Sequence, residues 1–288
     1  MRSVRSLTLG LLGTVSFAAS CASPAPAPAV GPAPASAAPI VRDSLESPWA
    51  VARRVGSFAN TIRFSSQLVS RVDSAERTDS STAIVRVSWT RLAGEEPARL
   101  SGLVSEYGVG IGTLGPAPLV GLRLPVPFSA TAGRGATQAQ LDVAFSGACS
   151  LATVVMQPAR DLFVSTPPSL KAGSTWGDSS SYTICRDSVP LQVRSARSFT
   201  VVGAERRAGV VLLLVDRTST VTMLGEGSQF GETLTVAAQG SGTMRLELRL
   251  DDGSIFTALG ESELKMMMRG RRRSQDLTQH TRIEITAP

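Results

Sequence analysis

The sequence predicts an all-β protein, mainly an antiparallel meander, half-barrel, barrel or sandwich, with at most one or two short helices. Two observations support this fold class. Apolar and charged side chains alternate strictly over residues 244–250 (MRLELRL), which is typical of a strand with one face in water. Other strand-like runs are separated by Gly, Ser and Asp at roughly the spacing found in sandwiches and barrels.

The N-terminal residues have the features of a signal peptide. Arg2 and Arg5 precede a mostly apolar stretch, residues 7–18. This stretch is too short to cross about 30 Å of hydrocarbon as a helix. Small residues follow at 18–20, as a cleavage site requires. We therefore expect residues 1–20 to be removed on export.

The residues at the expected cleavage site, Ala18-Ala19-Ser20-Cys21, resemble the lipobox of bacterial lipoproteins. The resemblance implies that Cys21 is acylated, for example with palmitate, and becomes the mature N-terminus. Ala22 follows Cys21 where an aspartate would signal retention, which in the Gram-negative family implies anchoring in the outer membrane, facing the periplasm. A secreted or periplasmic protein cut near the same place is the alternative.

A tether is expected after the lipidated cysteine, over residues 21–40. Residues 22–40 contain six prolines, eight alanines and no charged residue, so they cannot bury a core and should be extended. From residue 41 the composition becomes that of a globular chain. We expect one β-rich domain over 41–288, and two β halves joined through 116–170 are an alternative description of it.

The expected strands follow in chain order. They lie at 81–91, 97–107, 197–204, 208–223, 232–239, 244–250, 263–268 and 278–286. Asp251-Asp252-Gly253 is a turn signal, because Asp-Gly tolerates the positive φ of tight hairpins. One segment interrupts the β pattern: residues 150–163 could form a short helix with Ser150 as its N-cap.

Three cysteines leave one thiol without a partner if the other two pair, and acylation of Cys21 would account for it. Cys149 and Cys185 can then form a disulfide in an oxidising periplasm. Their bridge would close a loop of about 36 residues, worth about 3–4 kcal/mol on the chain-entropy model. Two buried free thiols are the alternative.

The charge pattern disfavours nucleic acid as a partner. Without Arg2 and Arg5, 27 of the 29 basic residues remain, against 23 acidic ones. A nucleic-acid surface would need a concentrated basic stripe with interleaved aromatic residues, and aromatic residues make up only 5% of the chain. The densest basic run, residues 269–273 (RGRRR), is expected in a hairpin loop.

The sequence offers no catalytic, cofactor-binding or metal-binding set, so we expect no cofactor. The single histidine, His280, lies in the expected last strand, and no G-x-S-x-G elbow is present. The motif at 110–115 matches G-x-G-x-x-G, but Pro116 follows instead of a helix. We interpret this motif and a second glycine-rich run, 225–231, as glycine-rich loops or strand kinks.

Carboxylates remain as candidates for a hydrolase or cation site, because folding can bring together pairs that lie far apart in sequence. The clusters are Glu95-Glu96, Asp178 and Asp251-Asp252, and all are expected in turns, where acidic side chains cap backbone donors. Three consecutive methionines, residues 266–268, are expected in the core.

Residues 167–178 (PPSLKAGSTWGD) resemble a turn found in some uncharacterised envelope lipoproteins, with matches at Gly173, Trp176 and Asp178. Some proteins of that group form an open half-barrel, as lipoprotein carriers do. The resemblance concerns the fold alone. Our leading hypothesis is a non-enzymatic envelope protein whose curved sheet binds an apolar or amphipathic ligand such as lipid, because a concave sheet with an apolar inner face offers a pocket. An adaptor that binds another envelope protein and a carboxylate-based hydrolase are the alternatives.

Overall fold

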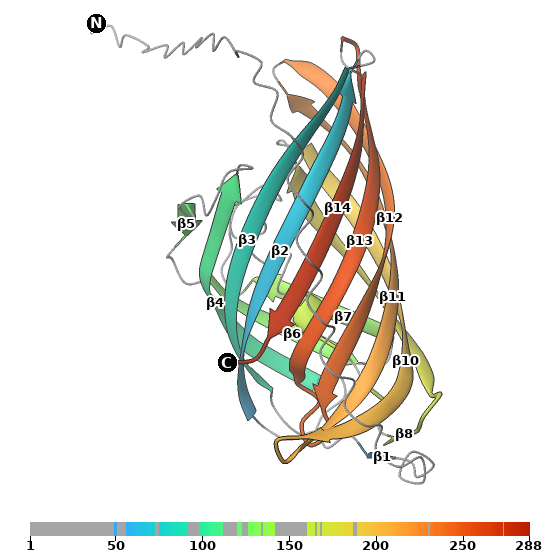
Figure 1. Ribbon diagram of the computed structural model, residues 1–288. Helices are drawn as coiled ribbons and strands as arrows, with labels where there is room; N and C mark the ends of the chain where they lie inside the picture. The colour runs from blue at the N-terminus through green and yellow to red at the C-terminus, as the bar shows by residue number, and fades with distance from the viewer. Residues whose placement is uncertain are drawn as a thin grey trace, which may run out of the picture. The chain divides into compact units, whose positions relative to one another are not determined.

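Long β-strands make up most of the part of the chain that the structure describes (Figure 1). The computed structural model describes residues 49–50, 56–72, 75–91, 98–111, 120–122, 126–133, 135–141, 160–164, 166–167, 169–186, 189–229, 231–272 and 274–288. All of them belong to one compact unit, Ala38–Pro288. The predicted signal peptide, Cys21 and the tether lie outside the described residues.

The described elements are, in chain order, β1 (Trp49–Ala50), β2 (Gly56–Val72), β3 (Ala75–Arg91), β4 (Ala98–Ile111), β5 (Val120–Leu122), β6 (Val126–Gly133), β7 (Gly135–Leu141), the 3-10 turn η2 (Arg160–Leu162), β8 (Ser169–Leu170), β9 (Thr175–Arg186), β10 (Val189–Arg207), β11 (Val210–Gln229), β12 (Glu232–Arg249), β13 (Ile255–Gly270) and β14 (Ser274–Thr286). The described ranges contain no α-helix, which confirms the predicted all-β class.

Eight strands form one antiparallel sheet, in the order β3-β2-β14-β13-β12-β11-β10-β9. Strands β9 to β14 follow one another as hairpins, and β14 then pairs with β2, so the two ends of the domain meet inside the sheet. Beyond β3, pairing continues through β4, β6 and β7. β7 contacts β9 through only two residue pairs, which are parallel. A separate pair joins β1 and β8.

The sheet is strongly curved, as in a half-barrel. Arg186 of β9 donates a hydrogen bond from Nη1 to Oε1 of Gln279 in β14, at 3.1 Å. In a flat sheet these strands, five places apart, would be separated by about 24 Å. An arginine side chain cannot cross that distance, so the sheet must curl to bring the two residues together on its inner face.

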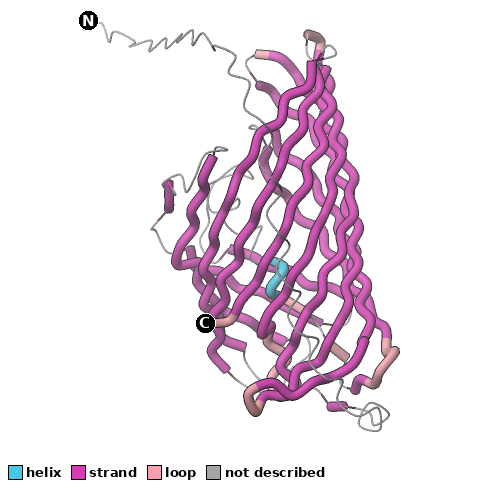
Figure 2. The backbone as a smooth tube through the Cα atoms, viewed as in Figure 1, coloured by secondary structure: helices cyan, strands magenta, loops and turns pink. Residues whose placement is uncertain are grey.

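The core lies on this inner face in two clusters. The first, the Phe163 cluster, joins residues of β2, β3 and β10–β14 to the segment after η2. Phe163 packs edge-on against Trp89, with ring centroids 6.0 Å apart. The short turn η2 lies among the strands in Figure 2. The second, the Met266 cluster, joins Met266, Met268 and Leu277 to residues of β9, β10 and β12.

The strands are longer than the sequence predicts. Residues 232–239 and 244–250, expected as two strands, form the single strand β12, and the return past Ile255 continues through 263–268 as β13. Strands β2, β6, β7 and β9 were not predicted. Residues 150–159 of the expected helix lie outside the described ranges, and Arg160–Leu162 form only a 3-10 turn.

Two hairpin turns fix the pairing of the long strands. Asp251-Asp252-Gly253 is a turn as predicted: Gly253 has a φ of 74°, and Asp252 Oδ1 accepts a hydrogen bond from the Ser254 backbone N–H at 2.7 Å. Ala208 and Gly209 connect β10 to β11 with φ values of 50° and 83°. Two consecutive positive φ values define a type I′ turn, in which alanine is strained.

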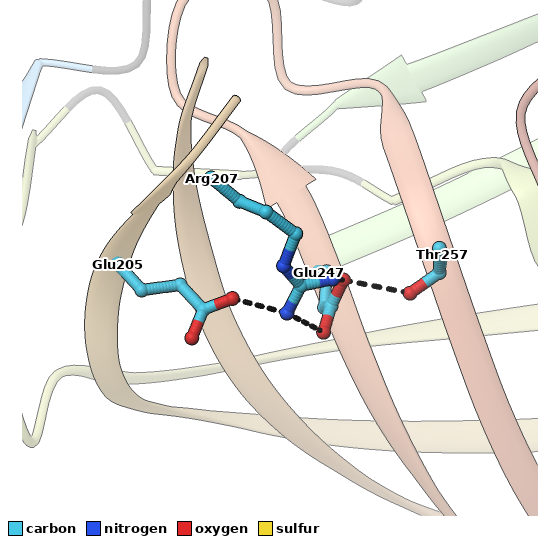
Figure 3. A network of polar contacts seen from close by, with 4 residues as sticks. All are labelled: Glu205, Arg207, Glu247 and Thr257. Carbon is cyan, nitrogen blue, oxygen red and sulfur yellow. Dashed lines mark hydrogen bonds and ion pairs between the residues drawn. The ribbon is translucent and has the colours of Figure 1, made fainter. Parts of the chain in front are cut away.

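A network of charged side chains lies on the outer face of β10, β12 and β13 (Figure 3). Arg207 donates two hydrogen bonds to the carboxylate of Glu247, at 2.9 and 3.0 Å, and also contacts Glu205. Thr257 Oγ1 donates to Glu247 Oε2 at 2.8 Å. The hydrogen bonds with Glu247 raise the pKa of Arg207. Arg207 therefore ties β10 to β12 across the intervening strand β11.

Replacing Ala208 by asparagine should stabilise the protein, because asparagine adopts positive φ at lower cost and Asn-Gly is the favoured type I′ pair. We expect the free energy of unfolding to rise by about 0.5–1 kcal/mol. Urea denaturation followed by circular dichroism measures the change. Ala237→Asn, in the middle of β12, is the control and should give no gain, because asparagine is disfavoured in strands. Equal or lower stability of A208N would contradict the turn assignment.

Candidate functional site

A row of small and polar residues crosses the inner face of the sheet. Its members lie directly opposite one another on the eight neighbouring strands, in the order Ser81, Ser66, Thr281, Ser262, Gly242, Ser219, Arg197 and Asp178. We call this set the polar row. Because side chains alternate between the faces of a strand, the polar row shares its face with the two apolar clusters and separates them.

Apolar side chains flank the polar row on both sides. Along β2, Ser66 lies between Phe64, which packs against the Phe163 cluster, and Leu68, which packs against the Met266 cluster. Along β13, Leu264 follows Ser262 on the side of the Met266 cluster. The inner face therefore changes from apolar to polar and back to apolar along β2, and from polar to apolar along β13.

Glycine is required at the centre of the polar row. A Cβ atom on Gly242 would lie 2.9 Å from both the carbonyl oxygen of Glu261 and the Cβ of Ser262. Real Cβ atoms do not make such contacts, so β12 and β13 approach more closely here than a side chain would permit. The missing side chain also leaves the backbone of β12 uncovered on the inner face.

A cavity of about 850 Å³ lies over the polar row. On each of six strands its wall consists of one member of the row and that member's two chain neighbours, namely 65–67, 80–82, 218–220, 241–243, 261–263 and 280–282. The central residue of each trio points inward. The flanking residues of each trio also line the cavity. The inward serine and threonine residues provide hydroxyl groups.

Hydrogen bonds organise one wall of the cavity. The hydroxyls of Ser66 and Thr281 lie 3.0 Å apart, across β2 and β14. Gln279 Nε2 donates to both, at 3.4 and 3.3 Å. The other end of the Gln279 amide accepts the hydrogen bond from Arg186. This chain of contacts connects the cavity wall to a guanidinium from the opposite part of the curved sheet.

Asp178 and Arg197 end the polar row as a buried ion pair. Their side chains are only 1% and 9% exposed, and Arg197 Nε donates to Asp178 Oδ1 at 2.6 Å. Arg197 Nη2 also donates to the carbonyl oxygen of Phe163, at 2.9 Å. The pair therefore joins β9 to β10 and holds the segment after η2 against the sheet.

The prediction that Asp178 lies in a turn is wrong. Gly173, with a φ of 79°, does lie in a turn, but β9 begins at Thr175 and places Asp178 inside a strand. Trp176 stacks on Phe199 of β10, with ring centroids 5.0 Å apart. The run of small polar residues at 177–181 resembles a turn in the sequence because the inner face at this height needs small side chains.

Other predicted residues lie where the sequence places them. His280 is in β14, exposed, with Nδ1 3.6 Å from Glu263 Oε2. Met266 and Met268 are buried in the core, whereas Met267 points outward. Of the predicted arginine-rich loop 269–273, Arg269 and Gly270 belong to β13, and Arg271 and Arg272 follow the end of that strand. Gly225, expected in a loop, is instead in β11.

The candidate carboxylates do not converge. Asp178 is paired in β9, whereas Asp251 and Asp252 lie in the turn between β12 and β13. Glu95 and Glu96 lie outside the described residues. Within the described ranges no three His, Cys, Asp or Glu side chains are grouped as metal ligands, and no helix there is long and apolar enough to cross a membrane.

Cys185 in β9 is disulfide-bonded. Its predicted partner, Cys149, lies outside the described residues, so the pairing remains a prediction.

Comparisons with known proteins give only weak structural similarity. No protein family and no curated protein matches the chain. DynF from the dynemicin biosynthesis pathway of Micromonospora chersina is 12% identical, with a TM-score of 0.25 over 83% of each chain. Pseudomonas aeruginosa OccK2 (OpdF) is 7% identical, with a TM-score of 0.27 over 80% of this chain and 98% of that one. TM-scores this low support no inference about fold or function.

Sequence reasoning missed the polar row, although a signal for it exists. Several strand-like runs contain two or three consecutive small polar residues near their middle, as in 65–66, 80–82, 218–220 and 240–242. Of these, only 240–242 falls between two expected strands, whereas 81–82 and 218–220 lie within expected strands. Only the register of the sheet shows that they lie side by side.

Replacing Asp178 by asparagine should destabilise the protein strongly, because it leaves the Arg197 guanidinium buried without its counter-charge. We expect a loss of about 3–5 kcal/mol in the free energy of unfolding, measured by urea denaturation. The matched control is Asp216→Asn, which breaks the exposed pair with Arg245 and should cost no more than about 1 kcal/mol. Similar losses for both variants would contradict the role given to the buried pair.

Proposed function

We propose that this protein is a non-enzymatic, exported envelope lipoprotein whose curved sheet binds an amphipathic ligand, such as a lipid, on its inner face. The observation that carries the proposal is the cavity of about 850 Å³ over the polar row. Its volume falls within the range of about 300–1,000 Å³ that is usual for small-molecule sites. The apolar-polar-apolar sequence along the strands is complementary to a ligand that has both kinds of surface.

The N-terminal residues support the location of the protein. The signal peptide, the acylated Cys21 and the proline-rich tether would station the domain at a membrane, with the outer membrane as the expected site. A ligand with an acyl chain is abundant there. The lipid anchor is an expectation from the sequence, and a separate experiment tests it.

Ligand binding can be tested with 1-monododecanoylglycerol added below its critical micelle concentration to delipidated protein. We expect a one-to-one complex in native mass spectrometry and a dissociation constant measurable by calorimetry. Ser262→Leu should weaken binding at least tenfold, because leucine projects into the cavity from the centre of the polar row. Ser198→Leu is the matched control, because Ser198 is exposed on the outer face of β10 and is not part of the cavity wall.

Circular dichroism and melting temperature must show that both leucine variants fold. Ser219→Leu, which fills the same cavity from β11, provides a second test. Equal binding by wild type, S262L and S219L would place the ligand elsewhere. Absence of binding by an acylglycerol and by its charged relatives would count against the proposed function as a whole.

Lipid anchoring predicts that Cys21→Ser moves the protein from the membrane pellet to the soluble fraction. The reason is that the substitution removes the only expected acylation site. Fractionation of expressing cells, with detection of a C-terminal tag, measures the distribution. Ser36→Ala in the tether is the control and should remain in the membrane fraction. An unchanged distribution of C21S would indicate a different means of attachment.

The adaptor alternative has one observation in its favour. Leu224 and Met267, on the outer face, are 64% and 52% exposed, and Ala237 lies directly between them in the register. This apolar surface could contact another protein. Crosslinking in intact cells followed by affinity purification would show whether a second envelope protein occupies it, and Met267→Glu should then abolish the crosslink.

A further inference from the structure

A second feature of the inner face concerns charge. Arg160, the first residue of η2, lies with its guanidinium carbon 4.0 Å from the centroid of the Tyr182 ring. Its Nη1 is buried and has no hydrogen-bond partner among the described residues. Burial lowers the pKa of Arg160, and Tyr182 opposes this effect. A buried guanidinium with an unsatisfied donor is costly unless an anion completes it.

Arg160 contacts the same inner face of the sheet that carries the cavity. Tyr182 lies on the inner face of β9, opposite Val193 and packed against the Met266 cluster. Arg186 lies on the same face of β9, two positions after Ile184, and donates a hydrogen bond to Gln279. The Gln279 amide in turn donates to the hydroxyls of Ser66 and Thr281, which line the cavity. Tyr182 and Arg186 thus lie on the same face of β9, and Arg186 connects that face to the cavity wall through Gln279.

We infer that Arg160 forms an anion subsite that selects amphiphiles with a negatively charged head group, such as a phosphate or carboxylate. The inference rests on the proposed function and specifies the class of its ligand. The head group would accept a hydrogen bond from the buried Nη1 of Arg160. The apolar part would lie against the apolar residues that flank the polar row. Arginine suits this role because it stays charged and presents several donors in a fixed plane.

The experiment compares ligands that differ only in charge. Dodecanoyl lysophosphatidate and 1-monododecanoylglycerol share one acyl chain and one glycerol, and only the first carries a phosphate. Calorimetry with the full mature chain should show at least about tenfold tighter binding of lysophosphatidate, the factor expected from one charge-assisted hydrogen bond. Dodecanoate tests a carboxylate in the same position, and inorganic phosphate tests the head group without a chain.

Arg160→Gln should remove the preference for the anionic ligand and leave binding of the monoacylglycerol unchanged. Arg160→Lys, which keeps the charge, should restore part of the preference. Arg194→Gln is the matched control, because Arg194 is exposed on the outer face of β10. If Arg160→Gln does not fold, the wild-type comparison of the two ligands decides whether an anion is preferred, and a reduced preference in Arg160→Lys tests the assignment to Arg160.

Each outcome separates the inference from the proposed function. Binding of both glycerides with equal affinity to the wild type would overturn the anion subsite and keep the proposed function. A preference that survives Arg160→Gln would also overturn the assignment to Arg160. Inorganic phosphate binding as tightly as lysophosphatidate would overturn the claim that the ligand is an amphiphile. Failure of all acylated probes to bind would overturn both.

Discussion

The register of the eight antiparallel strands is the constraint on which the site depends. Side chains alternate between the two faces, so a slip of one residue in any strand would move its inner residues to the outer face. The hairpin turns fix this register at the ends of the strands: Ala208-Gly209 sets β10 against β11, and the turn ending at Gly253 sets β12 against β13. The polar row exists only because all seven pairings agree.

Because the sheet is curved, this register produces a cavity on its inner face. A curled sheet brings its inner side chains toward one another, and large ones fill the space, as in the Phe163 and Met266 clusters. At the height of the polar row the side chains are serine, threonine and glycine, which cannot reach across. The cavity therefore results from the small size of the side chains at the position of the polar row. The buried pair of Asp178 and Arg197 ends the row and fixes the segment after η2 beneath it.

The same small residues explain what the sequence could and could not predict. The all-β class, the hairpin at 251–253 and the last strands could be predicted, because residues 244–250 and 278–286 alternate by local rules that need no partner. Strand β2 and the continuity of β12 could not be predicted from the sequence. Gly240-Ser241-Gly242 has the composition of a turn, and only the packing of β12 against β13 makes glycine necessary in mid-strand. The site could not be predicted, because it consists of one residue from each of many strands.

The chemistry of the cavity wall restricts what can occupy it. An entirely apolar ligand would exclude water from the hydroxyl groups of the polar row. The cost would be about 1–3 kcal/mol for each buried hydroxyl that lacks a partner within the protein, unlike those of Ser66, Thr281 and Ser219. An entirely polar ligand would leave Phe64, Leu68 and Leu264 with no apolar surface to cover. The complementary ligand has polar atoms opposite the row and apolar atoms on either side. Arg160, at the edge of the Met266 cluster, further restricts which ligands fit. Its buried guanidinium favours a ligand whose polar end is an anion.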